Sequence, residues 1–326
     1  MMTVKAKTRI MVNSTQISYF ILAAYFDPGL LKYFYFLIIL SLYVLIICSN
    51  LLLLVVICTN RSLHEPMYMF LCSLFVNEVF GSTGLFPFLL FQILSEIHTV
   101  SVPFCFLQVF CIFSYVCAEL SNLTIMSYDR YVAICHPLQY NTQMTNKRIA
   151  VLIALAWSFA FIAIAALILL IAPLQLCGNV INKVYCFNYS IVKLACSDTN
   201  ANNIYGLFLT FLIVFVPLIL ILYTYVRIIK VCLSGSKQTR QKAVSTCTPH
   251  LASILNFSFA VCFEILESRL EMKGVSSVFQ IILSLYFLTC QPLLNSVMYG
   301  LKMSKIRIKC KSLLLGFIVT RSLDER

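Results

Sequence analysis

Two acidic residues lie inside long apolar stretches of the sequence, where charged side chains are rare. Glu78 stands in the middle of one stretch, and Glu119 lies 11 residues before Arg130 in another. An unpaired charge at the centre of a bilayer costs about 2.5–3.5 kcal/mol, so each acid needs a partner. Two neighbouring carboxyl groups can share a proton or hold a cation. Together with Asn295, these acids are candidates for a sodium or proton site; a hydrogen-bonded cluster that only fixes helix packing is the alternative.

Four cysteines have a spacing that would allow disulfide bonds. Cys105 lies 25 residues before Arg130, about 37 Å along an α-helix, so the two residues would reach opposite membrane surfaces. Cys177, Cys186 and Cys196 lie in a long polar segment between two apolar stretches. In an oxidising compartment the four cysteines can pair in three ways, and the spacing alone does not choose among them.

The sequence lacks the motifs of hydrolytic and zinc enzymes. Its 4 histidines are scattered at the ends of apolar stretches, and neither an HExxH nor a GxSxG motif occurs. The 15 cysteines include no CxxC pair, and most lie in apolar runs, where cysteine behaves as a small hydrophobic residue. We therefore expect no enzyme, no cofactor and no metal other than the possible sodium at Glu78 and Glu119.

The composition identifies the elements that must position these residues. Apolar residues (A, V, I, L, M, F, W, Y and C) make up 61% of the 326 residues, and charged residues 11%. Soluble domains contain about 45–50% and about 25%, and a water-soluble globule could not bury so much apolar surface. The net charge of +12 comes from short Lys and Arg clusters between apolar stretches, which is typical of cytoplasmic loops and not of nucleic-acid binding. We therefore predict a membrane protein.

Seven stretches are long and apolar enough to cross a bilayer, which takes about 20 helical residues. They cover approximately residues 33–58, 67–95, 102–135, 148–172, 203–231, 243–266 and 276–301. With the N-terminus outside, the inner segments carry 16 Lys and Arg residues and the outer segments 8, which favours a cytoplasmic C-terminus. We predict an all-α membrane protein, a seven-transmembrane helix bundle.

The two ends of the chain flank the predicted transmembrane domain of residues 33–301. Residues 1–32 are expected to be extracellular and carry a glycosylation sequon at Asn13, with Met11 as an alternative start to Met1. Residues 302–326 are expected to be a cytoplasmic tail, in which basic and apolar residues predict a short amphipathic helix on the inner leaflet. Cys310 in this helix is a palmitoylation candidate, with a free thiol as the alternative.

Four motifs occur in order over nearly the whole chain. They are LHEPMY at 63–68, MSYDRYVAICHPLQY at 126–140, KAVSTC at 242–247 with His250-Leu251, and PLLNSVMY at 292–299. Together they closely resemble the motifs of odorant receptors, a family of rhodopsin-like (class A) G-protein-coupled receptors. The pair Asn77-Glu78 and the sequence Thr248-Pro249-His250 are similar to odorant receptors of fish.

The resemblance implies a receptor that binds a small odorant in the outer half of the bundle and activates a heterotrimeric G protein of the olfactory, stimulatory type, raising cAMP. It also implies the disulfides Cys105–Cys186 and Cys177–Cys196. The residues that it assigns to G-protein coupling and activation are Asp129, Arg130, Tyr131, Tyr225 and Tyr299. For the tyrosines, an interfacial aromatic belt is the alternative. The expected location is the plasma membrane, in the sensory cilia of olfactory neurons.

Helical spacing suggests which side chains line the ligand cavity. Ile112, Tyr115 and Val116 precede Glu119 by 7, 4 and 3 residues, so they share its face of the helix, nearer the outside. The full candidate set is Ile112, Phe113, Tyr115, Val116, Leu209, Val261 and Ile265. Ile112 stands where amine receptors carry an acid, so no salt bridge to an amine is expected at that position. Plain packing within the bundle is the alternative role for each residue.

Two other classes of membrane protein compete with a receptor. A secondary transporter favours inverted repeats and matching broken helices, and the sequence shows no such symmetry. A membrane enzyme needs a catalytic set, which the scattered histidines do not provide. The expected partners are therefore a small-molecule odorant, a heterotrimeric G protein and the lipid bilayer, with no nucleic acid. The identity of the odorant, trafficking chaperones and dimerisation are left open by the sequence.

Overall fold

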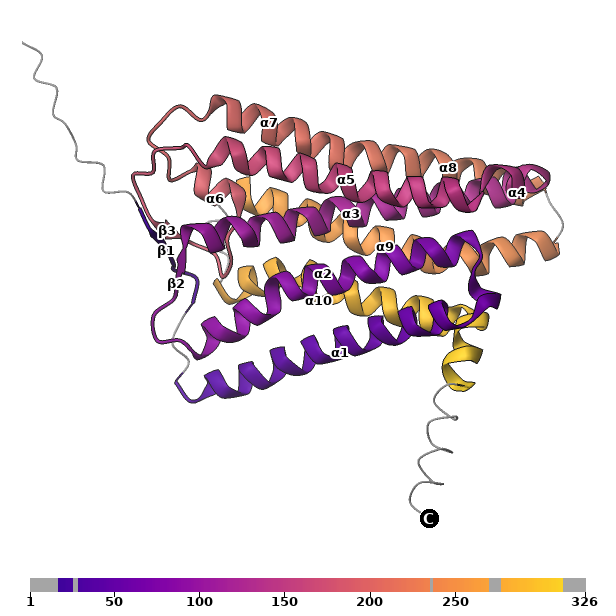
Figure 1. Cartoon of the computed structure of the whole chain (residues 1–326), viewed down its shortest axis with the longest axis horizontal. Coiled ribbons are helices and arrows are strands. Elements are labelled where there is room, and N and C mark those ends of the chain that lie inside the picture. Colours follow the sequence, from indigo (N-terminus) through magenta and orange to yellow (C-terminus); the bar gives the residue numbers. More distant parts are fainter. Residues whose placement is uncertain (1–16, 26–28, 235–236, 270–276, 313–326) are drawn as a thin grey trace, which may run out of the picture.

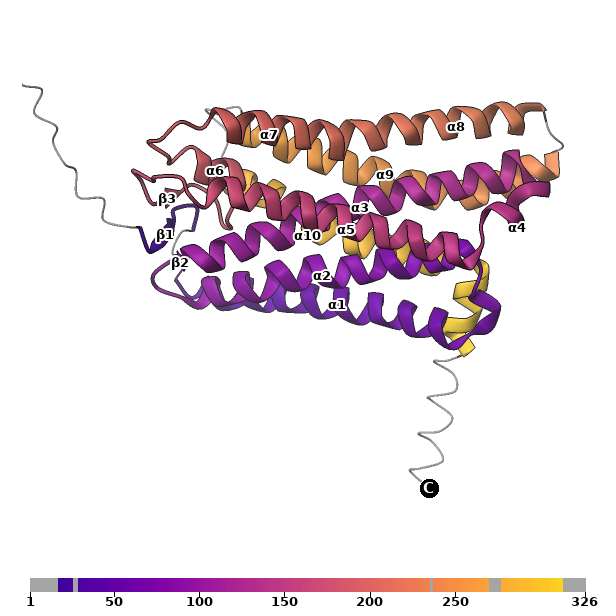
Figure 2. The same ribbon diagram turned by 45° about the horizontal axis from the view of Figure 1, so that its top comes forward.

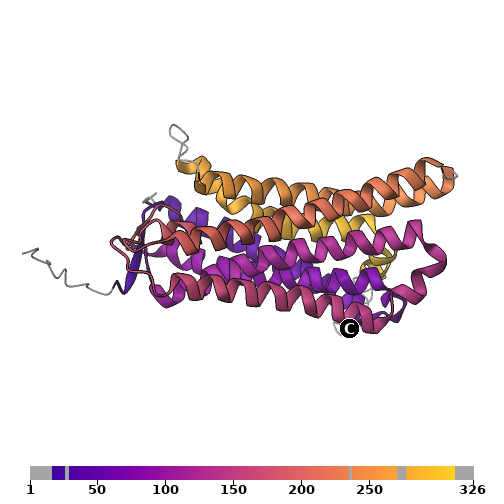
Figure 3. The same cartoon turned by 90° about the horizontal axis from the view of Figure 1, so that it is seen from above.

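Each predicted apolar stretch corresponds to one long helical segment in a computed structural model of the chain. The structure describes residues 17–25, 29–234, 237–269 and 277–312. The long helices run along a common axis and pack into one bundle, as Figure 1 shows and Figure 3 shows from above. Asn13, Met11 and the tail beyond residue 312 lie outside the described residues.

The long helices form seven segments. They are α1 (Leu31–Thr59), α2 (Pro66–Leu94), α3 (Val102–Cys135), α5 (Asn146–Ile171), α7 (Asn200–Thr210) continued by α8 (Val216–Ser234), α9 (Lys237–Arg269) and α10 (Ser277–Lys302). Within the described residues, six segments meet the length and hydropathy of a membrane span, and α10 is the seventh long helix. The predicted seven-helix bundle is therefore confirmed. The largest difference at an end is in α9, which begins at Lys237, before the predicted start at residue 243.

Short elements connect the long helices. Between α1 and α2 lies a single 3₁₀ turn, η1 (Arg61–Leu63), and between α3 and α5 lie η2 (Pro137–Gln139) and α4 (Tyr140–Gln143). The loop between α5 and α7 contains α6 (Asn188–Val192). Figure 2 places α6 and α4 at opposite ends of the bundle. We call the end with α6 the disulfide end, and the end with α4 and Arg130 the arginine end.

A small sheet at the disulfide end adds to the predicted helical fold. Its strands β1 (Tyr19–Leu22), β2 (Thr99–Ser101) and β3 (Val180–Ile181) are in the order β2-β1-β3, antiparallel on one side and parallel on the other. Phe20 and Leu22 of β1 are buried, whereas Tyr19 and Ile21 are exposed, the alternation of a strand with one packed face. Strands of two to four residues are too short to give a periodic sequence signal.

The side chains are distributed as expected for a protein in lipid. Large apolar residues such as Leu45, Ile162 and Leu222 lie exposed on the outside of the bundle, whereas Glu78 and Glu119 are fully buried. A soluble protein avoids exposing so much apolar surface. In a bilayer, by contrast, charged residues face the bundle interior and find partners there.

The segment between α7 and α8 is a π-helical turn, η3 (Phe211–Phe215), and Pro217 is the second residue of α8. Proline has no N–H group, and its ring clashes with the carbonyl group four residues earlier in a regular α-helix. A π turn relieves this conflict, and such turns occur often at functional sites. Here the turn presents Ile213 and Val214 to the cavity described below.

A further helix covers residues 304–312 and turns away from the direction of α10 at the arginine end (Figure 1). Ile306 is buried against the bundle, while Ile308 is exposed. Lys305 Nζ lies 2.6 Å from Glu65 Oε1, and this contact raises the pKa of the lysine. This helix corresponds to the first part of the predicted amphipathic helix.

Candidate functional site

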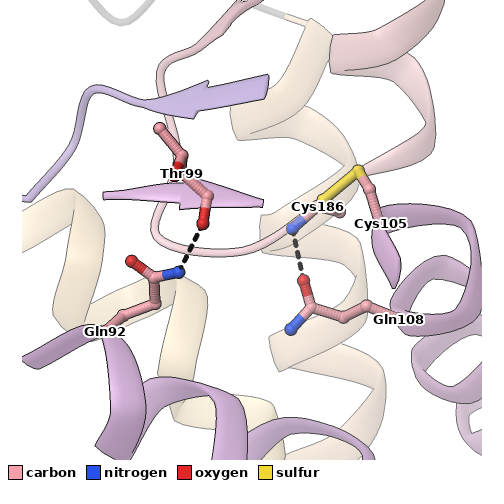
Figure 4. The surroundings of a disulfide bond; sticks show 5 residues. All are labelled: Gln92, Thr99, Cys105, Gln108 and Cys186. Atoms are coloured by element: carbon pink, nitrogen blue, oxygen red, sulfur yellow. Dashed lines mark hydrogen bonds between the residues drawn. A yellow bond between two sulfur atoms is a disulfide. The ribbon is translucent and has the colours of Figure 1, made fainter. Parts of the chain in front are cut away.

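Two disulfides fix the loop between α5 and α7 at the disulfide end. Cys105 of α3 is bonded to Cys186, and Cys177 is bonded to Cys196. Cys186 N donates to Gln108 Oε1 at 2.8 Å, which holds the loop against α3, as Figure 4 shows. This is the pairing that the resemblance implies. It places the residues after Cys186 over the end of the bundle.

Below this loop lies a cavity of about 100 Å³ between α3, α5, α7, η3, α6 and α9. Six of the seven predicted residues line it: Ile112, Phe113, Val116, Leu209, Val261 and Ile265. Ile112 and Val116 lie on one face of α3 because residues four apart share a face of a helix. A mainly apolar cavity of this kind suits a small ligand that is held by burial and a few polar contacts.

Tyr115 is the exception among the predicted cavity residues. It is not among the side chains that line this cavity. Its hydroxyl group donates to Glu78 Oε2 at 3.0 Å, and its ring packs against Phe257. Tyr115 is drawn deeper because Gly81 leaves no side chain in its way: a Cβ atom at Gly81 would lie 2.4 Å from the tyrosine ring.

The structure also reveals a charged cluster beside the cavity that the sequence patterns do not indicate. Glu264 of α9 lines the cavity. Lys183 Nζ lies 2.6 Å from Glu264 Oε1 and 2.6 Å from Glu267 Oε2, and the Tyr185 hydroxyl donates to Glu264 Oε1 at 2.8 Å. One feature of the sequence does indicate that Glu264 lies on the cavity side of α9: it follows Val261 by three residues and therefore shares its face of the helix.

The two predicted intramembrane acids meet in the middle of the bundle. Asn295 Nδ2 of α10 donates to Glu119 Oε1 at 2.9 Å and also to Glu78 Oε1. Three further polar residues, which the sequence did not indicate, complete the cluster: Asn77, Ser253 and Gln291. The predicted trio is therefore part of a larger network that joins α2, α3, α9 and α10.

The orientation of Asn295 determines which of its atoms face the two acids. Ser253 Oγ donates to Asn295 Oδ1 at 2.6 Å, so the amide turns its N–H₂ group towards the acids. Glu119 also accepts from Gln291 Nε2 at 3.1 Å and from Asn77 Nδ2 at 3.0 Å. The amides thus present N–H groups to the carboxylates.

At the arginine end, Arg130 is paired with its neighbour in the sequence. Arg130 donates to Asp129 Oδ2 through Nε at 3.0 Å and also through Nη2. The Tyr140 hydroxyl donates to Asp129 Oδ1 at 2.8 Å, and burial together with this carboxylate raises the pKa of Tyr140. Asp129 is fully buried, so the two partners satisfy a charge that would otherwise be costly.

A second polar contact at this end joins three helices. The Tyr225 hydroxyl of α8 lies 2.6 Å from Nδ1 of His250 of α9, and His250 Nε2 lies 3.0 Å from the Leu123 carbonyl oxygen of α3. Because a carbonyl group only accepts, Nε2 carries the proton and Nδ1 accepts from the tyrosine. We call this chain of contacts the tyrosine–histidine link.

The other two predicted tyrosines do not join either polar contact. The Tyr131 hydroxyl lies 3.0 Å from His136 Nε2 at the end of α3. Tyr299 is fully buried and packs against Phe75, and its hydroxyl group has no hydrogen-bond partner among the described residues. Tyr299 is therefore available to a new partner if the helices move.

A seven-helix membrane protein, with a small cavity near one end and a paired arginine at the other, is the class that these features define. A family model described as "Olfactory receptor" matches residues 39–316. The human protein Olfactory receptor 11A1 is 32% identical over 308 residues, which cover 94% of this chain and 96% of that protein. Human Olfactory receptor 10T2 is 33% identical over 304 residues (93% and 96%), and Olfactory receptor 51E1 is 33% identical over 298 residues (90% and 93%). The chain belongs to the olfactory receptor family and is a multi-pass membrane protein.

Proposed function

We propose that a small odorant binds in the cavity near the disulfide end and that the receptor then activates a heterotrimeric G protein of the olfactory, stimulatory type, which raises cAMP. The observation that carries this proposal is that α9 contributes residues both to the cavity and to the tyrosine–histidine link. Val261 and Ile265 of this helix line the cavity, and His250 of the same helix forms the tyrosine–histidine link. One continuous helix therefore connects the cavity to the arginine end.

The proposed orientation places the disulfide end outside the cell. Disulfides form and persist in oxidising compartments, and both bonds lie at this end. The opposite end carries basic residues such as Arg148, Arg227 and Lys305, as expected for the cytoplasmic side. The N-terminus and the odorant would then lie outside, and the G protein would meet the arginine end at the plasma membrane of sensory cilia.

The mechanism is a shift between two helix packings. His250 and Val261 are 11 residues apart, about 16 Å along α9. A ligand that moves the cavity end of α9 would displace His250 from Tyr225 and Leu123 and open a cleft next to Arg130. Tyr225 and Tyr299 would then support the open packing. The ligand favours this state only by its stronger binding to it, and no covalent step is involved.

The acid pair stabilises the closed packing as a proton site. Glu78 and Glu119 share the N–H₂ group of Asn295 and are fully buried. Two adjacent carboxylates in such a place repel each other unless one carries a proton. The amide donors around them support a proton rather than sodium.

The test is a cAMP assay in cells that express the chain with an olfactory-type G protein. A chemically diverse odorant panel should contain agonists, and the response should be absent in cells that lack either the receptor or the G protein. Ligand-driven flux of a substrate across the membrane without nucleotide exchange on the G protein would favour a transporter instead.

A further inference from the structure

Two residues that line the cavity each have a buried oxygen atom without a hydrogen-bond partner among the described residues. These atoms are Glu264 Oε2 and Asn188 Oδ1. The Glu264 side chain is only 5% exposed. An unsatisfied buried acceptor costs free energy, and more so when it carries a charge. Both atoms can only accept hydrogen bonds. A ligand group that contacts them must therefore be a hydrogen-bond donor.

The cluster around Glu264 explains why one of its oxygens remains available. Lys183 and Tyr185 both contact Oε1, and Oε2 has no partner among the described residues. Tyr185 stays a donor, because burial and the nearby carboxylates raise its pKa. Lys183 is shared with Glu267 at 2.6 Å, so one ammonium group faces two carboxylates. This cluster of three carries an excess negative charge.

Arg269 gives the cavity a competing positive group. It lines the cavity, and its guanidinium group lies 4.0 Å from the centroid of the Tyr189 ring. An arginine can bind a carboxylate ligand. A carboxylic acid is therefore the rival ligand class, but an acid would leave Glu264 Oε2 and Asn188 Oδ1 without donors.

We propose that the odorant of this receptor is a small apolar amine, whose ammonium group donates to Glu264 Oε2 and to Asn188 Oδ1 while its hydrocarbon part fills the cavity. An ammonium group has three N–H donors and forms charge-assisted hydrogen bonds, so it suits two acceptors, one of them charged. Ile112 remains apolar, as the sequence predicts; the acid comes from α9 instead of α3. This inference rests on the proposed function and names the ligand class of the same cavity.

The experiment compares hexylamine, hexanol and hexanoic acid, which share a chain length, in the cAMP assay. The variants are Glu264→Gln and, as a matched control, Glu267→Gln, which also loses a contact to Lys183 but does not line the cavity. Hexylamine should be the strongest agonist. Glu264→Gln should raise its half-maximal concentration about tenfold to a hundredfold and bring it close to that of hexanol, whereas Glu267→Gln should change it much less. Surface labelling normalises each response. If Glu264→Gln does not reach the surface, Asn188→Ala replaces it, and this variant is expected to weaken the response to hexylamine selectively.

Each contrary outcome has a distinct meaning. Equal effects of Glu264→Gln and Glu267→Gln would assign Glu264 to loop anchoring alone and overturn the proposal. A stronger response to hexanoic acid that is lost in Arg269→Ala would overturn it in favour of an acid ligand. If neutral odorants of a diverse panel activate the receptor while hexylamine does not, the amine inference fails and the receptor function stands. If no member of the panel activates any G protein, the proposed function itself fails.

Discussion

The hydroxyl group of Tyr225 lies 2.6 Å from Nδ1 of His250, and this contact ties α8 to α9 at the end of the bundle that carries Arg130. His250 is fully buried and also reaches the Leu123 carbonyl group of α3. One imidazole ring therefore joins three helices that separate in the proposed mechanism.

Replacing His250 by leucine should raise the basal activity of the receptor. The substitution removes the contacts to α8 and α3, worth about 1 kcal/mol each, so the open packing should gain about fivefold or more in population. Basal cAMP, corrected for surface expression, measures the effect. His64→Leu is the control, because the His64 side chain is exposed and lies 3.3 Å from the Cys58 carbonyl oxygen of α1. Unchanged basal cAMP in His250→Leu would contradict this role.

Arg130→Ala should abolish G-protein signalling while the receptor still reaches the cell surface. We propose that Arg130 leaves Asp129 on activation and contacts the G protein, and an alanine side chain cannot replace this contact. Agonist-stimulated nucleotide exchange and surface labelling are measured together. Arg148→Ala on α5, which removes a hydrogen bond to Tyr128, should signal normally. Full signalling by Arg130→Ala would refute the assignment.

Gly81→Ala should destabilise the receptor, because the new methyl group would lie 2.4 Å from the Tyr115 ring. Tyr115 is fully buried, so its ring has little room to move, and overpacking of this kind costs about 1–3 kcal/mol. Thermal unfolding of the purified receptor in detergent should show a lower midpoint. Gly300→Ala, whose nearest neighbour is Leu53 at 3.4 Å, should have a much smaller effect; equal midpoints would contradict the packing argument.

Glu119→Gln should destabilise the folded receptor less than Glu119→Ala. Glutamine keeps an oxygen for the amides of Asn77, Gln291 and Asn295, whereas alanine leaves these donors unpaired at about 1–3 kcal/mol each. The midpoints of thermal unfolding of the two purified variants measure this difference in stability.

Replacing sodium by choline in the buffer should leave the basal activity of the wild type unchanged, since the amides present N–H groups to the acids. If basal activity depends strongly on sodium and Glu119→Gln removes this dependence, the acids form a sodium site.

Sequence patterns predicted most of the architecture because membrane helices are encoded locally. The apolar stretches specify the seven helices, and helical spacing from Glu119 places Ile112 and Val116 on the cavity wall. The same spacing failed for Tyr115, because its position depends on the space left by Gly81 on a different helix.

The charged cluster at the cavity could not be predicted in the same way. Glu264 lies near the expected end of a span, where an acid is unremarkable, and its partners Lys183 and Tyr185 are about 80 residues away in a loop. The path of that loop is fixed by the Cys105–Cys186 bond, one of several pairings that spacing allows. A contact that depends on loop path leaves no periodic signal.

The central claim is that the odorant binds in the cavity and acts on the G protein through α9. Filling the cavity tests this claim most directly, because a bulky residue can be placed on α9 either inside or outside the cavity. Val261→Trp fills the cavity, while Leu255→Trp changes a residue of the same helix that is 68% exposed. Nucleotide exchange on the purified G protein is measured with an agonist from the panel and each receptor variant in lipid nanodiscs. We predict that Val261→Trp loses the agonist response and that Leu255→Trp retains it. An agonist response of Val261→Trp equal to that of the wild type would contradict the account.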